Sequence, residues 1–199
     1  MPPRPYVSPH RDAAAAIRRA EVVAAASRVL RGSEGLAAFS LDAVAKAAGV
    51  TRLTVYNQFG SRRGLLEAVL DDLARQGGLG RIPEAMAMPA RAGLDRLVEI
   101  FCDFWGGDPA MPSLQAAKAV DPDFAQALAE RNERRRLLIG ALVERLPPDE
   151  RPDASRHRDA VDLIFALTGH AMFETLHAGR TTEEVCTLLK SACAAALAG

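Results

Sequence analysis

Apolar residues recur along the chain at intervals of three and four, which is the spacing of one buried face of an α-helix. No long stretch alternates apolar and polar residues as a half-buried strand would. Clusters of glycine and proline interrupt the helical pattern, and the connection through Pro83 and Pro89 reads as a loop. The pattern predicts an all-α fold, with helices over about residues 13–31, 40–48, 51–59, 61–73, 91–105, 113–120, 122–146, 160–178 and 182–197.

The stretch 40–59 predicts two short helices joined by a tight turn. Its first half carries apolar residues at i, i+3, i+4 and i+7, and Ser40 and Thr51 are suitable N-caps for the two helices. Gly49 follows the first helix, where a residue that tolerates positive φ is favoured, and Val50 can then turn inward between the helices.

The second of these helices separates apolar from polar residues. Val55 and Phe59 lie four apart on one face, so Arg52, Thr54, Tyr56 and Asn57 occupy the remaining surface. A helix, a short turn with glycine and a helix with basic and amide side chains form the pattern of a DNA-reading helix-turn-helix. An ordinary pair of packed helices with a solvated face is the alternative.

Several residues in this part of the chain resemble the TetR (tetracycline-repressor-like) family of transcriptional regulators over about residues 13–75. They are Val44-Ala45, Ala48-Gly49-Val50, Thr54-Val55-Tyr56, Phe59 and Leu65-Leu66. The resemblance implies an all-α homodimer with a small N-terminal DNA-binding domain and a larger C-terminal domain for effector binding and dimerisation. It also implies that the last two helices, about 160–178 and 182–197, pair with their copies.

This resemblance defines three regions: an N-terminal arm (1–12), which its prolines predict to be disordered, the DNA-binding domain (13–75) and the C-terminal domain (81–199). Arg4 and Arg11 of the arm either reach an adjacent groove or belong to an unattached tail. The sequence departs from the family at two positions, with Arg62 where a lysine is usual and Leu53 where a small residue is usual.

The charges are distributed unevenly although the net charge is zero. Residues 1–66 hold ten Lys and Arg against four Asp and Glu, whereas the rest of the chain holds fifteen against twenty-one. A basic N-terminal part attracts DNA with one end of the molecule, unless the asymmetry reflects chance in a solvated surface. The start of the chain lacks the apolar segment of a signal peptide, and we expect a cytoplasmic protein.

Catalytic and metal-binding patterns are missing from the sequence. His170 and His177 are two helical turns apart with Glu174 between them, a wider spacing than zinc chelation uses, and we predict no metal or cofactor. The three cysteines lack a CxxC spacing, and no phosphate-binding loop or nucleophile elbow occurs, so we expect no enzyme. The arginines at 131 and 134–136 form either an anion site or a solvated helix face.

Large apolar residues of the C-terminal domain are candidates for an effector pocket, although they suit a plain core equally well. If an effector exists, an uncharged apolar or aromatic molecule fits them best. The candidate ligand-binding residues are Phe101, Phe104, Trp105, Met111, Phe124, Phe165, Met172 and Phe173.

The sequence therefore predicts a dimeric repressor that binds a near-palindromic operator and is released by a small ligand. Arg52 is the candidate for a guanine contact and Leu53 for a thymine methyl, while Arg62 suits a phosphate. The alternative is a ligand-binding or scaffold protein of the same fold that does not read DNA. The candidate DNA-binding residues are Ser40, Thr51, Arg52, Leu53, Thr54, Tyr56, Asn57 and Arg62.

Overall fold

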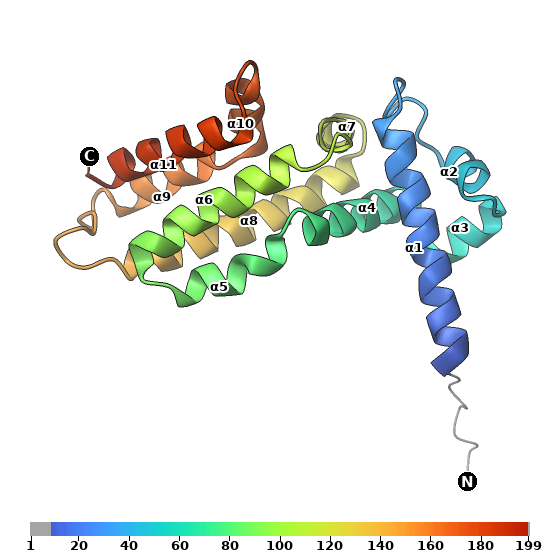
Figure 1. Cartoon of the computed structure of the whole chain (residues 1–199), viewed down its shortest axis with the longest axis horizontal. Coiled ribbons are helices and arrows are strands. Elements are labelled where there is room, and N and C mark those ends of the chain that lie inside the picture. The colour runs from blue at the N-terminus through green and yellow to red at the C-terminus, as the bar shows by residue number, and fades with distance from the viewer. Residues whose placement is uncertain (1–8, 199) are drawn as a thin grey trace, which may run out of the picture. The chain divides into compact units, whose positions relative to one another are not determined.

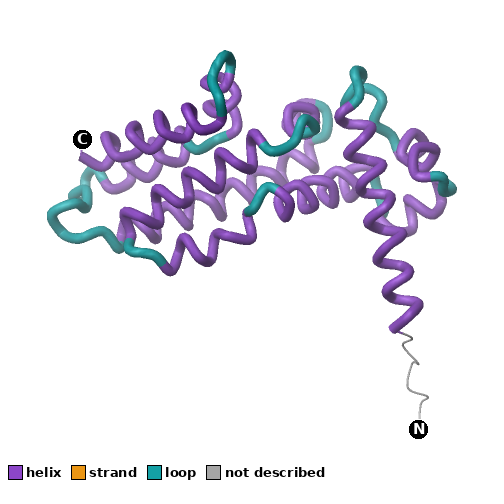
Figure 2. Tube along the Cα trace, viewed as in Figure 1, coloured by secondary structure: helices purple, strands orange, loops and turns teal. Residues whose placement is uncertain are grey.

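The computed structural model describes residues 9–198, with side chains described from residue 13 onward. Every regular element in this part of the chain is a helix, which confirms the all-α fold class (Figure 2). The chain divides into two compact units. The N-terminal unit contains the residues up to Asp72 together with Pro112–Phe124, and the C-terminal unit contains Leu73–Met111 and the residues from Ala125 onward.

The N-terminal unit is built around α1 (Pro9–Arg31), α2 (Leu41–Ala48), α3 (Arg52–Phe59) and most of α4 (Arg62–Gln76) (Figure 1). Helix α2 contacts both α1 and α3. Each helix contributes the apolar face that its sequence predicts, and burial of these faces holds the short helices in place. The core side chains include Val22, Ala26, Leu30, Phe39, Val44, Val55, Phe59, Leu65 and Leu66.

Helix α1 begins earlier than the sequence pattern indicates. It starts at Pro9, so residues 9–12, which were predicted to belong to a disordered arm, are helical. Proline is compatible with the first turn of a helix because its missing N–H has no partner there in any case. The rest of the predicted arm, including Arg4, lies outside the described residues, as does the side chain of Arg11.

The N-terminal unit also includes a segment that was predicted to belong to the C-terminal domain. This segment holds most of α7 (Met111–Ala116), the 3-10 helix η2 (Ala117–Ala119) and the first residues of α8 (Pro122–Glu144). The backbone at Gly35 approaches it closely, since a Cβ atom there would lie 2.7 Å from Oγ of Ser113. Such a contact joins residues far apart in sequence, and no local pattern predicts it.

The C-terminal unit consists of η1 (Leu79–Arg81), α5 (Ile82–Ala87), α6 (Ala90–Gly106), most of α8, α9 (His157–Leu167), α10 (His170–His177) and α11 (Thr182–Ala198). Helix α6 contacts α5, α10 and α11, and α9 contacts α11. The predicted loop through Pro83 and Pro89 contains the short helix α5, because Pro83 stands in the first turn, where proline is tolerated.

The helix predicted over 160–178 is wrong in one respect, because the structure breaks it between α9 and α10. Gly169 is extended, with φ −80° and ψ 155°. The carbonyl of Thr168, which would accept from residue 172 in a continuous helix, accepts instead from Nε1 of Trp105 at 2.9 Å. The Thr168 hydroxyl donates back to the Ile164 carbonyl at 2.8 Å. A tryptophan from another helix thus stabilises the end of α9.

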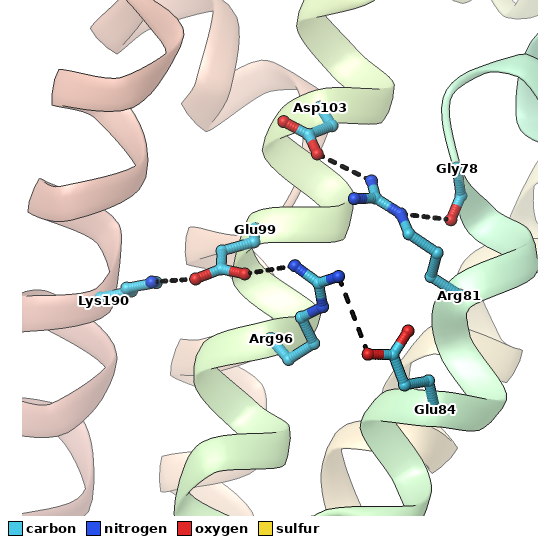
Figure 3. A network of polar contacts seen from close by, with 7 residues as sticks. All are labelled: Gly78, Arg81, Glu84, Arg96, Glu99, Asp103 and Lys190. Atoms are coloured by element: carbon cyan, nitrogen blue, oxygen red, sulfur yellow. Dashed lines mark hydrogen bonds and ion pairs between the residues drawn. The ribbon is translucent and has the colours of Figure 1, made fainter.

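A network of ion pairs on the surface of α6 reaches α11 through Lys190 (Figure 3). Glu99 of α6 accepts hydrogen bonds from Nζ of Lys190 on α11 and from Nη1 of Arg96 at 2.8 Å. Lys190 and then Arg96 hold the pKa of Glu99 below its usual value. Nη2 of Arg81 donates to Asp103 at 2.7 Å and attaches η1 to the same face of α6. These contacts fix α11 and η1 against α6.

Candidate nucleic-acid interface

Helices α2 and α3 form a helix-turn-helix whose turn has the predicted geometry. Gly49 adopts the left-handed conformation, with φ 67° and ψ 28°, and its N–H donates to the Lys46 carbonyl at 3.3 Å. The N–H of Val50 donates to the Ala45 carbonyl at 3.0 Å. A left-handed residue at this position lets the chain reverse at once, so α3 starts three residues later, at Arg52.

Hydroxyl side chains cap both helices of the motif. Oγ of Ser40 accepts from the Ala43 N–H at 3.1 Å, and Oγ1 of Thr51 accepts from the Thr54 N–H at 3.1 Å. Each hydroxyl keeps its own O–H as a donor, and Oγ1 of Thr51 lies 2.9 Å from Oγ1 of Thr54. Capping by these residues therefore remains compatible with the phosphate contacts predicted for Ser40 and Thr51.

Helix α3 presents a continuous exposed face that would be available to a ligand. Val55 and Phe59 are buried, and Thr54 is half-buried. Leu53 and Tyr56 are 66% and 55% exposed, which places two large side chains in solvent with no core role. The remaining exposed residues of this face are Arg52 and Asn57. This face would meet a groove of DNA if α3 enters one.

The side chain of Arg52 is weakly constrained. Its Nη1 lies 3.7 Å from Oδ2 of Asp42, and both side chains are about two-thirds exposed, at 67% and 68%. Water screens such a pair, which is worth little in stability. Arg52 can therefore leave Asp42 at small cost to contact a base edge.

Arg62 is positioned by groups of its own unit. Its Nε donates to the Phe39 carbonyl at 3.2 Å, and its Nη1 lies 3.7 Å from Oδ2 of Asp121. The guanidinium also lies over the Phe39 ring, 5.6 Å from its centroid. Helix α4 begins at Arg62 itself, with Oγ of Ser61 accepting from the Gly64 N–H at 3.0 Å. A structural role for Arg62 therefore accompanies the predicted phosphate contact.

Sequence reasoning missed how arginines of α1 hold the C-terminal ends of α2 and α3. Nη1 of Arg19 donates to the Gln58 carbonyl at 2.6 Å, and its guanidinium lies 4.2 Å from the centroid of the Phe59 ring. Nη2 of Arg28 reaches the Ala47 carbonyl at 3.4 Å. The sequence did show these arginines outside the apolar face of α1. Since a cation near a helix C-terminus is favourable, they were the available signal for such contacts.

The eight candidate ligand-binding residues do not gather at one place. Phe124 lies in the N-terminal unit, because the start of α8 belongs there, so its assignment to the C-terminal domain is wrong. Phe101, Phe104, Trp105, Met111 and Phe173 are buried within or at the end of the C-terminal unit, while Phe165 and Met172 are half-buried.

Three of the predicted ligand residues, Phe101, Phe104 and Trp105, form an aromatic cluster on α6. The ring centroids of Phe104 and Trp105 lie 4.5 Å apart, and those of Phe101 and Trp105 lie 6.2 Å apart. Phe165 joins this cluster through Arg135, whose guanidinium carbon lies 5.4 Å from the Phe101 centroid and 4.3 Å from the Phe165 centroid. The interpretation of the arginines around residue 135 as a solvated face is thus wrong for Arg135, which is buried.

Surface hollows of the C-terminal unit have a different lining. One lies between α8 and α9, one beside the connector around residues 148–154, and one between α6 and α11. None of these three hollows is lined by a residue from the predicted ligand set. Within the described part of the chain, no three His, Cys, Asp or Glu side chains gather as metal ligands would. The same part contains no helix long and apolar enough to cross a membrane.

Comparison with known proteins supports the assignment of the motif. Residues 23–69 match the family described as "Bacterial regulatory proteins, tetR family". The chain is 34% identical over 95 residues to the HTH-type transcriptional regulator EthR of Mycolicibacterium smegmatis. That match spans 47% of this chain and 43% of EthR, less than half the length of this curated relative.

Two solved structures share the fold over most of the chain. A TetR-like transcriptional regulator from Rhodococcus sp. RHA1 is 22% identical, with a TM-score of 0.68 and full coverage of both chains. The regulator LfrR from Mycobacterium smegmatis, in complex with proflavine, is 23% identical, with a TM-score of 0.55 over 90% of this chain and 96% of that one.

Together with the geometry of α2 and α3, these matches define an all-helical protein with an N-terminal helix-turn-helix DNA-binding domain. The part of the chain that carries this motif, residues 23–69, is similar to the tetR family of bacterial regulatory proteins.

Proposed function

We propose that this protein is a homodimeric transcriptional repressor that binds a near-palindromic operator and leaves it when a small molecule binds. The observation that carries the proposal is the outer face of α3, where Leu53 and Tyr56 stand exposed beside Arg52 and Asn57. A protein of the same fold that does not read DNA has no need for this combination of exposed apolar, basic and amide groups.

The proposed contacts divide into those that read bases and those that hold phosphates. Arg52 makes a bidentate contact to a guanine, and Leu53 meets a thymine methyl in the same groove. Thr54 and Asn57 contact bases or the adjacent sugar-phosphate. Phosphates would be held by Tyr56, Ser40, Thr51 and Arg62, and these contacts would fix the orientation of α3.

Dimerisation through α9, α10 and α11 sets the spacing of the two reading helices. Leu163 on α9 is 53% exposed and Leu188 on α11 is 42% exposed. Large apolar side chains on two helices that contact each other suit a self-complementary interface. Half-sites would lie about one turn of DNA apart, roughly 34–36 Å, or further if the C-terminal units hold the reading heads wider.

Relatives of the same fold support the effector part of the proposal. LfrR was solved in complex with proflavine and the multidrug binding protein EbrR in complex with ethidium. A small apolar or aromatic effector that prefers one spacing of the reading heads would shift the operator affinity by that preference. Such a regulator acts in the cytoplasm and catalyses no reaction.

The first test measures how tightly the purified protein binds the DNA upstream of its own gene and random DNA of equal length. Fluorescence anisotropy reports the binding over a series of salt concentrations. The affinity for the upstream DNA should exceed the affinity for random DNA. The logarithm of the binding constant should fall with the logarithm of the salt concentration, with a slope of about 0.9 per phosphate contacted. Unbiased selection of DNA sites then defines the operator. Failure to select any sequence would support the alternative, a ligand-binding protein that does not read DNA.

A further inference from the structure

Arg135, on α8, holds its positive charge inside the C-terminal unit. The residue is 6% exposed, and its Nη1 donates to Oγ1 of Thr168 at 2.9 Å. Its Nε is fully buried and has no hydrogen-bond acceptor among the described residues. A buried donor without an acceptor, and above all a buried cation, is costly unless a partner compensates it.

The described residues place no carboxylate against this guanidinium. Among residues 13–198, no carboxylate lies within ion-pair distance of Arg135. The rings of Phe101 and Phe165 stabilise a cation through their faces but carry no net charge. Burial, and then the neighbouring charge of Arg136, lower the pKa of Arg135 to about 10, which still leaves it protonated at neutral pH.

The unused part of the guanidinium is the edge formed by Nε and Nη2. Two parallel N–H groups on one edge match the two oxygens of a carboxylate, and such a pair is stronger than a neutral hydrogen bond. Nη2 makes no hydrogen bond to a described residue and lies beside Gly169, where a Cβ atom would be 3.6 Å away. Glycine at the break between α9 and α10 therefore places no side chain against Nη2.

We propose that Arg135 binds the carboxylate of a small-molecule effector whose apolar body lies against the aromatic side chains of α6 and α9. This inference rests on the proposed ligand-regulated function and names the chemical class of the effector. It changes the expectation of an uncharged ligand, because the aromatic cluster suits an apolar body whereas Arg135 requires an acid.

A hollow beside the cluster offers room for such a body. It lies between α8 and α9, and its wall combines Leu137, Ala141 and Val161 with charged side chains that include Glu133, Glu144 and Asp162. Arg136 also lines it, and the Arg136 guanidinium lies 4.2 Å from the centroid of the same Phe165 ring that Arg135 contacts. Phe165 does not line the hollow itself, but its ring lies against the guanidinium groups of both Arg135 and Arg136.

Trp105 provides a direct report of binding, because it is the single tryptophan of the chain. Its Nε1 donates to the carbonyl of Thr168, whose hydroxyl accepts from Arg135. We would titrate the full-length protein, without DNA, with 4-phenylbutyrate, decanoate and 2-naphthoate. Each acid is paired with its neutral amide, so that the body is constant and only the charge changes. Tryptophan fluorescence and the shift in Tm are measured for the first two, and the Tm shift alone for 2-naphthoate, which absorbs light.

The key variant is Arg135→Met, which removes the charge and keeps much of the volume. The wild type should bind at least one acid about tenfold more tightly than its amide, and Arg135→Met should abolish this preference while changing the amide affinity by less than about threefold. Arg135→Lys, which keeps the charge but loses the two-donor edge, should retain part of the preference. Arg134→Met is the matched control, because Arg134 is exposed on the same helix and lines neither the hollow nor the aromatic cluster, and it should keep the preference.

Two outcomes would overturn the proposal. One is that none of the three acids raises the Tm of the wild type more than its amide does. The other is that Arg135→Met lowers the Tm but leaves the acid preference intact, which would make Arg135 a structural residue. Operator binding is measured separately, so specific DNA binding without an acid effect would reject this inference alone. An acid effect without DNA binding would reject the regulator and keep the site.

Discussion

Arg52 and Arg62 differ in what holds their side chains, and this difference separates their expected roles. Arg52 is exposed and has only a screened pair with Asp42. Arg62 donates to the Phe39 carbonyl and lies beside Asp121, within its own unit. A side chain with few partners is free to read a base, whereas one with several partners contributes to the fold as well.

Arg52→Ala should weaken operator binding and remove the preference for one particular base pair, because only a base contact discriminates between sequences. The expected cost is about 1–3 kcal/mol on the cognate operator and much less on an operator altered at that position. Anisotropy titrations with single-base operator variants measure this. Arg158→Ala, which removes a 90% exposed arginine from the C-terminal unit, serves as the control and should leave affinity unchanged. Equal losses on every DNA sequence would show that Arg52 holds a phosphate instead.

Arg62→Ala should affect both stability and DNA binding. Removing its hydrogen bond to the Phe39 carbonyl should lower the free energy of unfolding by about 1–2 kcal/mol. If Arg62 also holds a phosphate, the variant should bind all DNA sequences more weakly. The slope of the logarithm of affinity against the logarithm of salt concentration should then become shallower by the amount of about one phosphate contact. Urea denaturation and salt titrations of the folded variant separate the two effects. Unchanged stability would mean that the Phe39 contact contributes nothing, and an unchanged salt slope would remove Arg62 from the phosphate contacts.

At the residue scale, sequence reasoning succeeded where a role depends on near neighbours. The caps at Ser40 and Thr51 and the left-handed Gly49 follow from residues within four positions. The partners of Arg62 lie 23 and 59 positions away, and those of Arg135 lie on other helices. Only the folded chain brings such groups together, so no local pattern predicts them.

At the scale of elements, the contact between α6 and α11 depends on a charge network that responds to pH. Glu99 accepts from Lys190 across the two helices and from Arg96 on its own helix. These partners lower the pKa of Glu99 in the folded state. The stabilisation is therefore present above the pKa of the unfolded chain and is lost as the pH falls through the lower pKa of the folded state.

Glu99→Gln should lower the free energy of unfolding near neutral pH. Its side chain is 34% exposed, so solvent screening limits the effect to about 1 kcal/mol. The difference from the wild type should shrink as the pH falls below the usual pKa of a glutamate and through the lowered pKa of Glu99, because the wild-type carboxylate then becomes protonated as well. Thermal unfolding over a pH series measures this. Glu183→Gln is the control, since Glu183 is exposed on α11 and pairs with no described residue, and a difference that persists at low pH would reject the explanation.

The break between α9 and α10 shows the limit of periodicity at this scale. The apolar pattern runs through residues 160–178 without interruption, so it predicts one helix. The break arises because Trp105 of α6 takes the Thr168 carbonyl and Gly169 adopts an extended conformation. A single glycine inside an apolar pattern is tolerated by many helices, and it becomes a break here through a tertiary contact.

At the scale of the whole molecule, the N-terminal unit contains the basic part of the chain but is less basic than that part alone, because it also takes acidic residues that follow residue 66. The basic part of the chain covers residues 1–66, within the N-terminal unit. That unit also takes Pro112–Phe124, which brings Asp121 next to Arg62. A chain segment that returns to an earlier domain leaves no signature in composition, so the boundary at residue 75 was the most that the sequence supported.

The proposed dimer makes operator affinity depend on residues that never touch DNA. Leu163→Glu and Leu188→Glu would each place a charge, twice by symmetry, in an apolar interface. Either variant should shift the dimer to monomers at micromolar concentration and weaken operator binding by at least about a hundredfold, because one head then binds alone.

Light scattering measures the dimer and anisotropy measures the affinity. Leu137→Glu is the matched control, because Leu137 is 64% exposed but lies on α8, outside the proposed interface. It should leave both properties unchanged. If Leu137→Glu alone produces monomers, the chain dimerises through α8, and the spacing of the reading heads must be derived from that interface.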